Sequence, residues 1–164
     1  MNSAYLLLGS NLNDRFAQLQ KAKQEISSTI GKILKESSVY ESEPWGFPSE
    51  NWFLNQVVTI ETELRPLEVL DKIFKIEKKL GRHRTLIKRY ESRLIDIDIL
   101  FYNDEIISET TLTIPHPKIP ERMFTLIPLF ELDKSRIHPG LGKSIEELIK
   151  ECTDTLSVNL YRPK

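Results

Sequence analysis

The sequence predicts an α+β fold, in which an antiparallel sheet carries two helices on one face. Two stretches, residues 13–30 and 66–80, repeat an apolar residue every three or four positions, as one face of an amphipathic helix does. The runs before and after them are rich in Val, Ile, Thr and Leu, which is typical of strands. The composition, 40% hydrophobic and 29% charged, is that of a globular domain.

The first half of the chain predicts a strand, a helix and two more strands. The apolar run Ala4–Leu8 ends in a turn at residues 9–11. The helix over residues 13–30 stops at Gly31, because glycine is a common helix end. Beyond it the predicted elements are an extended segment at 38–42, a long proline-containing loop at 43–52 and a strand at 53–61.

The second half adds a helix and a strand. Pro66 opens the second helix, at the first position, where proline is well tolerated, and Gly81 ends it. A polar, basic loop at 82–92 leads into residues 94–102, the strongest strand pattern of the chain.

The order strand, helix, strand, strand, helix, strand is that of a ferredoxin-like βαββαβ core. A C-terminal extension follows, irregular over the prolines at 115–120 and helical again from about Ser144, which forms a capping box with Glu147. We expect residues 1–164 to form a single domain, since domains commonly have ~100–150 residues. The sheet face without helices should be free for a site.

Charge and cysteine content exclude several classes of protein. A net charge of -1 argues against dedicated binders of nucleic acid or anionic membranes. Cys152 is the only cysteine, so no disulfide within the chain can form. The first residues lack the regions of a signal peptide, and no apolar run approaches the ~18 residues of a membrane span. We expect a cytoplasmic monomer without nucleic-acid or membrane partners.

Asp96 and Asp98 alternate with isoleucines inside the strongest predicted strand. Both carboxylates therefore point to one face, roughly 6.6 Å apart, a span that suits two magnesium ions ~3.5–4 Å from each other. A half-buried strand with a solvated polar face would show the same alternation. Aspartate is depleted in strands, however, and like charges on one face repel, which favours a metal site.

The loop before this strand is strongly basic. Residues 82–93 hold five Lys or Arg, one His and a single acid, Glu91. Arginines beside a carboxylate pair suit a metal-bound polyphosphate, because metals neutralise some phosphate oxygens and guanidiniums bind others. A solvated surface loop is the alternative, and the position next to Asp96 favours phosphate binding.

Three further polar residues allow either a structural or a binding role. Glu77 lies on the apolar stripe of the second helix, at the rim of the core or pointing into a site. His116 stands between two prolines that hold the backbone extended, where it is merely exposed or contacts phosphate. Asn55 follows an aromatic-rich loop, which either forms a hydrophobic cluster or helps hold a flat heterocycle by stacking and hydrogen bonds.

Several motifs stand in one register along most of the chain. They run from YLLLGSNLNDR at Tyr5, through SEPWG at 42–46, to IPHP and the ERMFTLIPLFEL segment that ends at Leu132. The most specific is RLIDIDILFY at 93–102. Together they resemble the 6-hydroxymethyl-7,8-dihydropterin pyrophosphokinase family, whose signature surrounds two metal-binding aspartates and whose pterin-side loop is similar to SEPWG.

The resemblance implies an ATP-dependent diphosphokinase of folate biosynthesis, which transfers diphosphate from ATP to the hydroxymethyl group of the reduced pterin and releases AMP. It implies two Mg2+ ions on Asp96 and Asp98, with Arg82 and Arg93 holding phosphates and assisting transfer. The implied ATP-side residues are Glu77, Arg84, Tyr90, Thr113, His116 and Arg122. The implied pterin-side residues are Ser42, the backbone of Trp45, Asn55 at the amide edge, and the ring walls Phe53 and Phe124.

Three positions depart from the family pattern. Tyr90 stands where many relatives have tryptophan, Glu91 where glycine is usual, and Thr111 where an arginine can bind phosphate. Two other classes share parts of the pattern. A palm-like nucleotidyl transferase also sets carboxylates on such a sheet, and an RNA-binding module of this fold places aromatic residues on it.

Overall fold

The computed structural model describes residues 1–46, 51–81 and 94–163, and it confirms the predicted α+β fold. The core consists of β1 (Asn2–Ser10), α1 (Arg15–Thr29), β2 (Lys32–Glu36), β3 (Tyr40–Ser42), β4 (Phe53–Thr62), α2 (Pro66–Lys79) and β5 (Asp96–Tyr102). The extension consists of β6 (Ile107–Ser108), β7 (Thr113–Ile114), a 3-10 turn (Ile119–Glu121), α3 (Met123–Asp133), β8 (Ile137–His138), β9 (Lys143–Ser144), α4 (Ile145–Glu151) and β10 (Val158–Leu160).

The strands of the main sheet pair antiparallel, in the order expected of a ferredoxin-like core. β1 and β4 lie side by side, from Asn2 opposite Thr62 to Ser10 opposite Leu54. β5 pairs with the other edge of β1, while β2 and β3 pair one after the other with the other edge of β4. The extension contributes β10, which pairs with the outer edge of β3.

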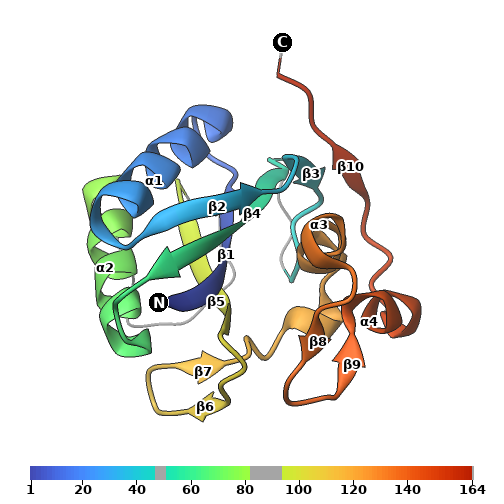
Figure 1. Cartoon of the computed structure of the whole chain (residues 1–164). Helices are drawn as coiled ribbons and strands as arrows, with labels where there is room; N and C mark the ends of the chain where they lie inside the picture. Colours follow the sequence, from blue (N-terminus) through green and yellow to red (C-terminus); the bar gives the residue numbers. More distant parts are fainter. Residues whose placement is uncertain (47–50, 82–93, 164) are drawn as a thin grey trace.

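α1 and α2 pack on one face of this sheet, as the sequence predicts (Figure 1). Asp14 caps α1 by accepting a hydrogen bond from the Ala17 N–H at 3.0 Å, which satisfies one of the free donors of the first turn. The buried residues of the two helices pack against alternate residues of β1, β4 and β5. This cluster includes Leu19, Ile26 and Ile73 from the helices and Leu6, Leu8, Val58, Ile60, Ile97 and Ile99 from the strands. This cluster is the larger of the two hydrophobic cores.

The opposite face of the sheet is partly covered, so the expectation of a face without helices was wrong, although the polar residues described below lie on this face. α3 and α4 cover part of it (Figure 1), and a second cluster joins the sheet to these helices. Its buried members are Leu7, Val57, Leu100, Phe101, Ile119, Leu126, Leu129, Ile145 and Leu148. The sequence did not reveal α3 because Pro128 lies inside it and apolar residues surround most of its circumference, which leaves no amphipathic stripe.

A β-bulge in β5 lets this strand contribute to both faces. Tyr5 lies opposite Phe101 and Leu6 opposite Ile99, so Leu100 is an extra residue between two paired ones. As a result Leu100 and Phe101 both pack toward α3 and α4, whereas Ile99 packs toward α1 and α2.

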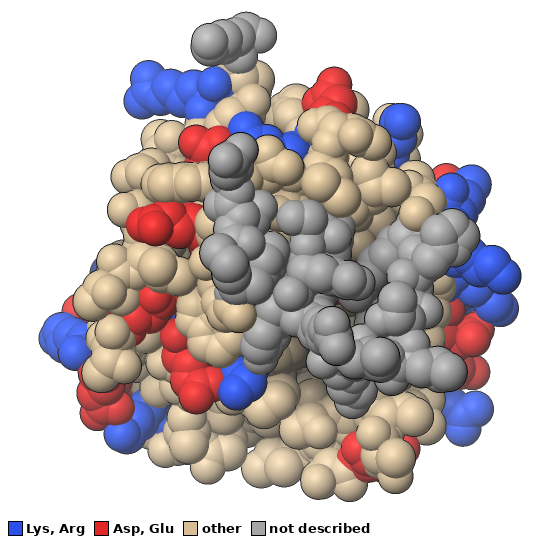
Figure 2. Space-filling view, turned by 180° about the vertical axis from the view of Figure 1, so that it is seen from behind, with Lys and Arg blue, Asp and Glu red and all other residues tan. Residues whose placement is uncertain are grey.

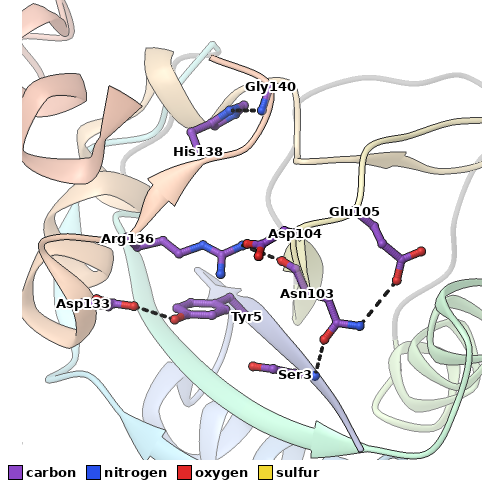
Figure 3. Close-up of polar contacts among 9 residues, drawn as sticks. All are labelled: Ser3, Tyr5, Asn103, Asp104, Glu105, Asp133, Arg136, His138 and Gly140. Carbon is purple, nitrogen blue, oxygen red and sulfur yellow. Dashed lines mark hydrogen bonds and ion pairs between the residues drawn. The ribbon is translucent and has the colours of Figure 1, made fainter. Parts of the chain in front are cut away.

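Polar and aromatic contacts attach the extension to the sheet (Figure 3). The Tyr5 hydroxyl donates to Asp133 Oδ2 at 2.8 Å. Arg136 donates to the carbonyl oxygen of Asn103 at 2.5 Å, and its guanidinium lies 5.2 Å and 4.6 Å from the ring centroids of Tyr5 and Phe101. Cation–π contacts of this kind stabilise a partly buried arginine. These contacts join β1 and the end of β5 to the last residue of α3 and to the segment that follows it.

The described surface is mixed in charge. On the face that Figure 2 shows, acidic and basic side chains of the described residues lie interspersed. Within residues 1–46, 51–81 and 94–163, no helix has both the length and the apolar character needed to cross a bilayer.

Candidate active site

Two polar residues and a glycine, from three neighbouring strands, form one row on the α3 face of the sheet. Gly9 in β1 lies opposite Asp96 in β5 and opposite Asn55 in β4. Strands in a sheet are spaced ~4.8 Å apart, so the backbones of Asp96 and Asn55 are roughly 10 Å from each other. A Cβ atom at Gly9 would lie 3.2 Å from Asn55 Oδ1, so glycine leaves room between the two side chains.

Asp96 is the half-buried carboxylate of this row. Asp98, also half-buried, lies in the next row on the same face, opposite Leu7. The side chains of β5 alternate between the two faces as predicted: Ile97 and Ile99 pack into the helix-side core, and the two aspartates point to the other face. Carboxylate oxygens are the ligands that magnesium prefers, and magnesium usually takes one or two of them together with waters and substrate phosphates. In the described part of the chain no group of three or more His, Cys, Asp or Glu is arranged to hold a metal ion. A carboxylate pair is nevertheless a donor set that fits magnesium bound together with a polyphosphate.

His116 lies beside this pair. Its backbone N–H donates to the Leu100 carbonyl at 3.0 Å, and its Nε2 lies 4.0 Å from Asp98 Oδ1. The ring nitrogen Nδ1 accepts the backbone N–H of Lys118 at 3.1 Å, so in the neutral ring the proton is on Nε2. Burial, followed by the positive charge of Arg122, lowers the pKa of His116 to about 4, although Asp96 acts in the opposite direction. The ring is therefore neutral at pH 7 and offers an N–H donor toward Asp98.

Glu77 reaches the same strand from the opposite face of the sheet. Its side chain is buried, and Oε2 accepts the backbone N–H of Ile97 at 2.9 Å. Ile97 lies between the two aspartates, and among the described strands β5 is the last on this side of the sheet. Glu77 therefore satisfies a backbone donor at the outer edge of β5 and holds the strand that carries both carboxylates. The prediction that it lines an ATP site stays a prediction.

The predicted pterin-side residues Asn55 and Ser42 are in direct contact. Asn55 Nδ2 donates to Ser42 Oγ at 2.7 Å, and both side chains are buried. This bond fixes the orientation of the carboxamide, so that its Oδ1 faces Gly9. Phe53, on the same face of β4 as Asn55, is half-buried and lies opposite Ser42 in β3.

Trp45, Arg122 and Phe124 form a stacked group near the start of α3. The Arg122 guanidinium lies 4.6 Å from the ring centroid of Trp45 and 5.4 Å from that of Phe124. Lys118 also approaches the Trp45 ring, at 5.9 Å. The structure thus brings one predicted ATP-side residue, Arg122, together with two predicted pterin-side residues.

Thr113, the remaining predicted residue within the described ranges, is not part of these contacts. It is exposed in β7, where it lies opposite Ser108. Four others, Arg82, Arg84, Tyr90 and Arg93, lie outside the described residues.

Gly9 is a site residue that the sequence reading assigned to a turn. The structure places it within β1, between Asp96 and Asn55. A glycine inside a strand often marks a close approach of a ligand or of another backbone, and this signal became visible only once the structure extended the strand to Ser10.

The comparisons with known proteins identify the family of the chain. A family model described as 7,8-dihydro-6-hydroxymethylpterin-pyrophosphokinase (HPPK) matches residues 5–134. The chain belongs to the HPPK family. The resemblance seen in the sequence is thereby confirmed, and the palm-like and RNA-binding alternatives are set aside.

Individual HPPK proteins match nearly the full length. The chain is 42% identical over 153 residues to the 2-amino-4-hydroxy-6-hydroxymethyldihydropteridine pyrophosphokinase of Aquifex aeolicus, which covers 93% of this chain and 94% of the relative. The enzyme of the same name from Haemophilus influenzae is 40% identical over 161 residues, 98% of this chain and 99% of the relative.

A solved structure confirms the fold. A Plasmodium falciparum HPPK-DHPS triple mutant superposes with a TM-score of 0.75 at 20% identity, over 92% of this chain and 44% of that chain. The chain therefore corresponds to less than half of that longer protein.

Proposed function

We propose that this chain transfers a diphosphate from ATP to the hydroxymethyl group of 6-hydroxymethyl-7,8-dihydropterin, releasing AMP, as a step of folate biosynthesis. The pyrophosphokinases of Aquifex aeolicus and Haemophilus influenzae, which it matches over nearly their full length, support the reaction class. The observation that carries the proposal is the row Asp96–Gly9–Asn55, in which a carboxylate and a fixed carboxamide flank a glycine that has no side chain.

In the proposed reaction the pterin hydroxymethyl oxygen attacks the β-phosphorus of ATP. The bond from that phosphorus to the oxygen shared with the α-phosphate breaks, AMP leaves with the electron pair, and the hydroxyl proton passes to solvent. Asp96 and Asp98 would hold two magnesium ions, which would neutralise part of the triphosphate charge. The protein contributes mainly positioning and charge stabilisation, as in other phosphoryl transfers.

The pterin binds on the Asn55 side of the row. The carboxamide, oriented by Ser42, pairs with the amide edge of the ring, because buried polar atoms of a heterocycle need partners. Phe53 and Phe124 form the two walls that sandwich the ring, and the Trp45 backbone closes the pocket.

ATP binds on the Asp96 side. His116, neutral with its proton on Nε2, donates to a phosphate oxygen next to Asp98. Arg122 adds a positive charge beside it, Glu77 holds the strand, and Thr113 lines the nucleotide. The family resemblance assigns the further contacts to Arg82, Arg84, Tyr90 and Arg93.

The test is incubation of the purified protein with MgATP and 6-hydroxymethyl-7,8-dihydropterin, with separation of the nucleotides and pterins by chromatography. AMP and pterin diphosphate should form in equal amounts, and omission of the pterin should abolish AMP formation. Formation of ADP with a pterin monophosphate, or AMP release without any pterin, would contradict the proposal.

The oligomeric state and domain organisation belong to the same proposal. We expect residues 1–164 to act as one domain, because β1, β4 and β5 contribute side chains to both hydrophobic clusters. We expect a monomer that does not bind nucleic acid or membranes. Light scattering coupled to size-exclusion chromatography should give a mass near 19.1 kDa.

A further inference from the structure

We infer that the C-terminal segment Asp154–Tyr161 is a positioning element for the pterin side of the site. The inference rests on the proposed function. The segment lies beyond residues 5–134, which match the HPPK family model, and it contains none of the predicted site residues. It follows α4 and runs beside β3 along the outer edge of the sheet (Figure 1). Its contacts lead to three separate segments, each of which carries a pterin-side residue.

The first contact is at the beginning of α3. Asp154 Oδ2 accepts the backbone N–H of Met123 at 3.0 Å, while Oδ1 accepts that of Leu156 at 3.0 Å. The N-cap residue of α3 is Arg122, whose side chain makes no capping hydrogen bond. Asp154 therefore supplies from a distant segment the acceptor that a helix N-terminus needs, and its charge is favourable there. It fixes the turn that presents Arg122 and Phe124.

The second contact is with β3. Val158 lies opposite Ser42, and the neighbouring Ser157 and Glu43 exchange two hydrogen bonds. The Glu43 N–H donates to the Ser157 carbonyl at 3.2 Å, and the Ser157 N–H donates to Glu43 Oε1 at 2.9 Å. Since β3 is only three residues long, pairing on its outer edge restrains it strongly. The restraint reaches Asn55 through the hydrogen bond to Ser42.

The third contact passes through Arg15. The Arg15 guanidinium lies 5.6 Å from the ring centroid of Tyr161. Its Nη1 donates to the carbonyl oxygen of Trp52 at 2.9 Å and to Glu41 Oε2 at 2.6 Å. The Tyr161 ring thus covers the arginine that holds the Trp52 carbonyl, and Phe53 is the next residue along the chain.

These contacts predict a selective effect. They restrain the segments that carry Phe124, Ser42 and Phe53, whereas Asp96, Asp98 and His116 are held by the pairing of β5 with β1 and by the Leu100 carbonyl. Weakening the segment should therefore loosen the pterin pocket more than the nucleotide side, where Arg122 alone of the described ATP-side residues shares a restrained segment. A site that is displaced by even 1 Å loses much of its efficiency.

The experiment compares Asp154→Ala and Tyr161→Ala with the wild-type chain. Each variant should raise the KM for the pterin, at saturating MgATP, by roughly five- to tenfold, the effect expected from one lost contact. In Tyr161→Ala the KM for ATP and kcat should change less than about twofold. In Asp154→Ala the KM for ATP should rise less than the KM for the pterin, because Arg122 is the one described ATP-side residue in the loosened turn. Asp154→Ser keeps a capping oxygen and Tyr161→Phe keeps the ring over Arg15, so both should restore the pterin KM.

A matched control separates positioning from general loss of stability. Ser144 caps α4 by accepting the Glu147 N–H at 3.1 Å, so Ser144→Ala also removes one helix cap. It should lower the melting temperature about as much as Asp154→Ala does, and leave the pterin KM unchanged. The dissociation constant of the pterin, titrated with a non-hydrolysable ATP analogue present, should follow the KM values.

The outcomes distinguish this inference from the proposed function. A wild-type chain that forms no AMP with the pterin would overturn the proposed function. Wild-type activity with an unchanged pterin KM in Asp154→Ala and Tyr161→Ala would overturn only the positioning role. An equal rise of the KM for ATP and for the pterin would also overturn it, because the effect would then be general.

Discussion

The two aspartates of the site are held by backbone contacts on both edges of their strand. β1 pairs with one edge of β5, and Glu77 accepts the Ile97 N–H at the other. The isoleucines on the opposite face are buried against α1 and α2. The carboxylates can therefore be changed chemically without loss of the strand.

Asp96→Asn and Asp98→Asn should each lower kcat by about 10²–10³-fold or more, because a charged group that stabilises the transition state is lost. The melting temperature should change little, since the buried face of β5 is intact. Steady-state rates over a range of magnesium concentrations measure the effect. Near-normal magnesium-dependent turnover in either variant would exclude the assigned metal role.

Tyr5 is a single residue whose ionisation is linked to the attachment of the extension. Burial, followed by the hydrogen bond to Asp133 and the charge of that carboxylate, raises the pKa of Tyr5 to about 12 from an ordinary value of 10.0. Because the folded state holds this proton more tightly, its contribution to stability is complete below pH 10 and disappears as the pH rises toward 12.

Tyr5→Phe should accordingly be less stable than the wild type at pH 8, and the difference should narrow as the pH rises from 10 to 12. Urea unfolding midpoints at several pH values give the comparison. The pKa of Tyr40 is also raised to about 12, by burial and by its hydrogen bond to Glu131. Tyr40 is present in both proteins, so its contribution cancels in the difference between their stabilities. A constant difference across this pH range would show that Tyr5 contributes through packing alone.

At the scale of elements, the sequence predicted the core better than the extension. Each predicted core helix begins and ends within two residues of the observed helix. The spacing of apolar residues located both helices, and Gly31 and Gly81 marked their ends. β2 was not predicted, because four of its five side chains are exposed and the segment shows no alternation of buried and exposed residues. β10 was missed for the same reason, and its pairing with β3 depends on a chain path that local patterns do not contain.

Two kinds of signal in the sequence located parts of the candidate site, namely strand alternation and the family resemblance. The shared face of Asp96 and Asp98 follows from their spacing, and the family resemblance brought Asn55 and Ser42 to one pocket. The position of His116 beside Asp98 depends on the course of the proline-rich segment, and the capping of α3 by Asp154 joins residues 31 positions apart. Contacts of this kind are set by tertiary packing.

α3 offers a direct test of how far packing on the second face stabilises the protein. Leu126 is fully buried against the sheet, whereas Phe130 on the same helix is 39% exposed. Leu126→Ala should lower the free energy of unfolding by about 2–5 kcal/mol, the usual cost of such a cavity. Phe130→Ala should cost clearly less. Denaturant unfolding of both variants checks this, and equal losses would show that α3 is not anchored mainly through its inner face.

At the scale of the whole molecule, the two hydrophobic clusters share the strands β1, β4 and β5. A strand cannot leave one cluster and remain ordered in the other, so the described parts should unfold together. Ile73→Ala, under α2, and Leu126→Ala, under α3, should each shift one common transition. Tryptophan fluorescence and far-UV circular dichroism should give coincident curves for each variant. Separate transitions in either variant would mean that the extension unfolds independently.

The bulge at Leu100 gives β5 two stretches that differ in how freely they can change over evolution. On the side of Asp96 and Asp98, a shift of one residue would turn both carboxylates into the helix-side core, so this stretch allows neither insertion nor deletion. On the far side, the extra residue already absorbs such a shift, so that Phe101 and Tyr102 can adapt to a remodelled extension. A remodelled extension can therefore leave the spacing of Asp96 and Asp98 unchanged.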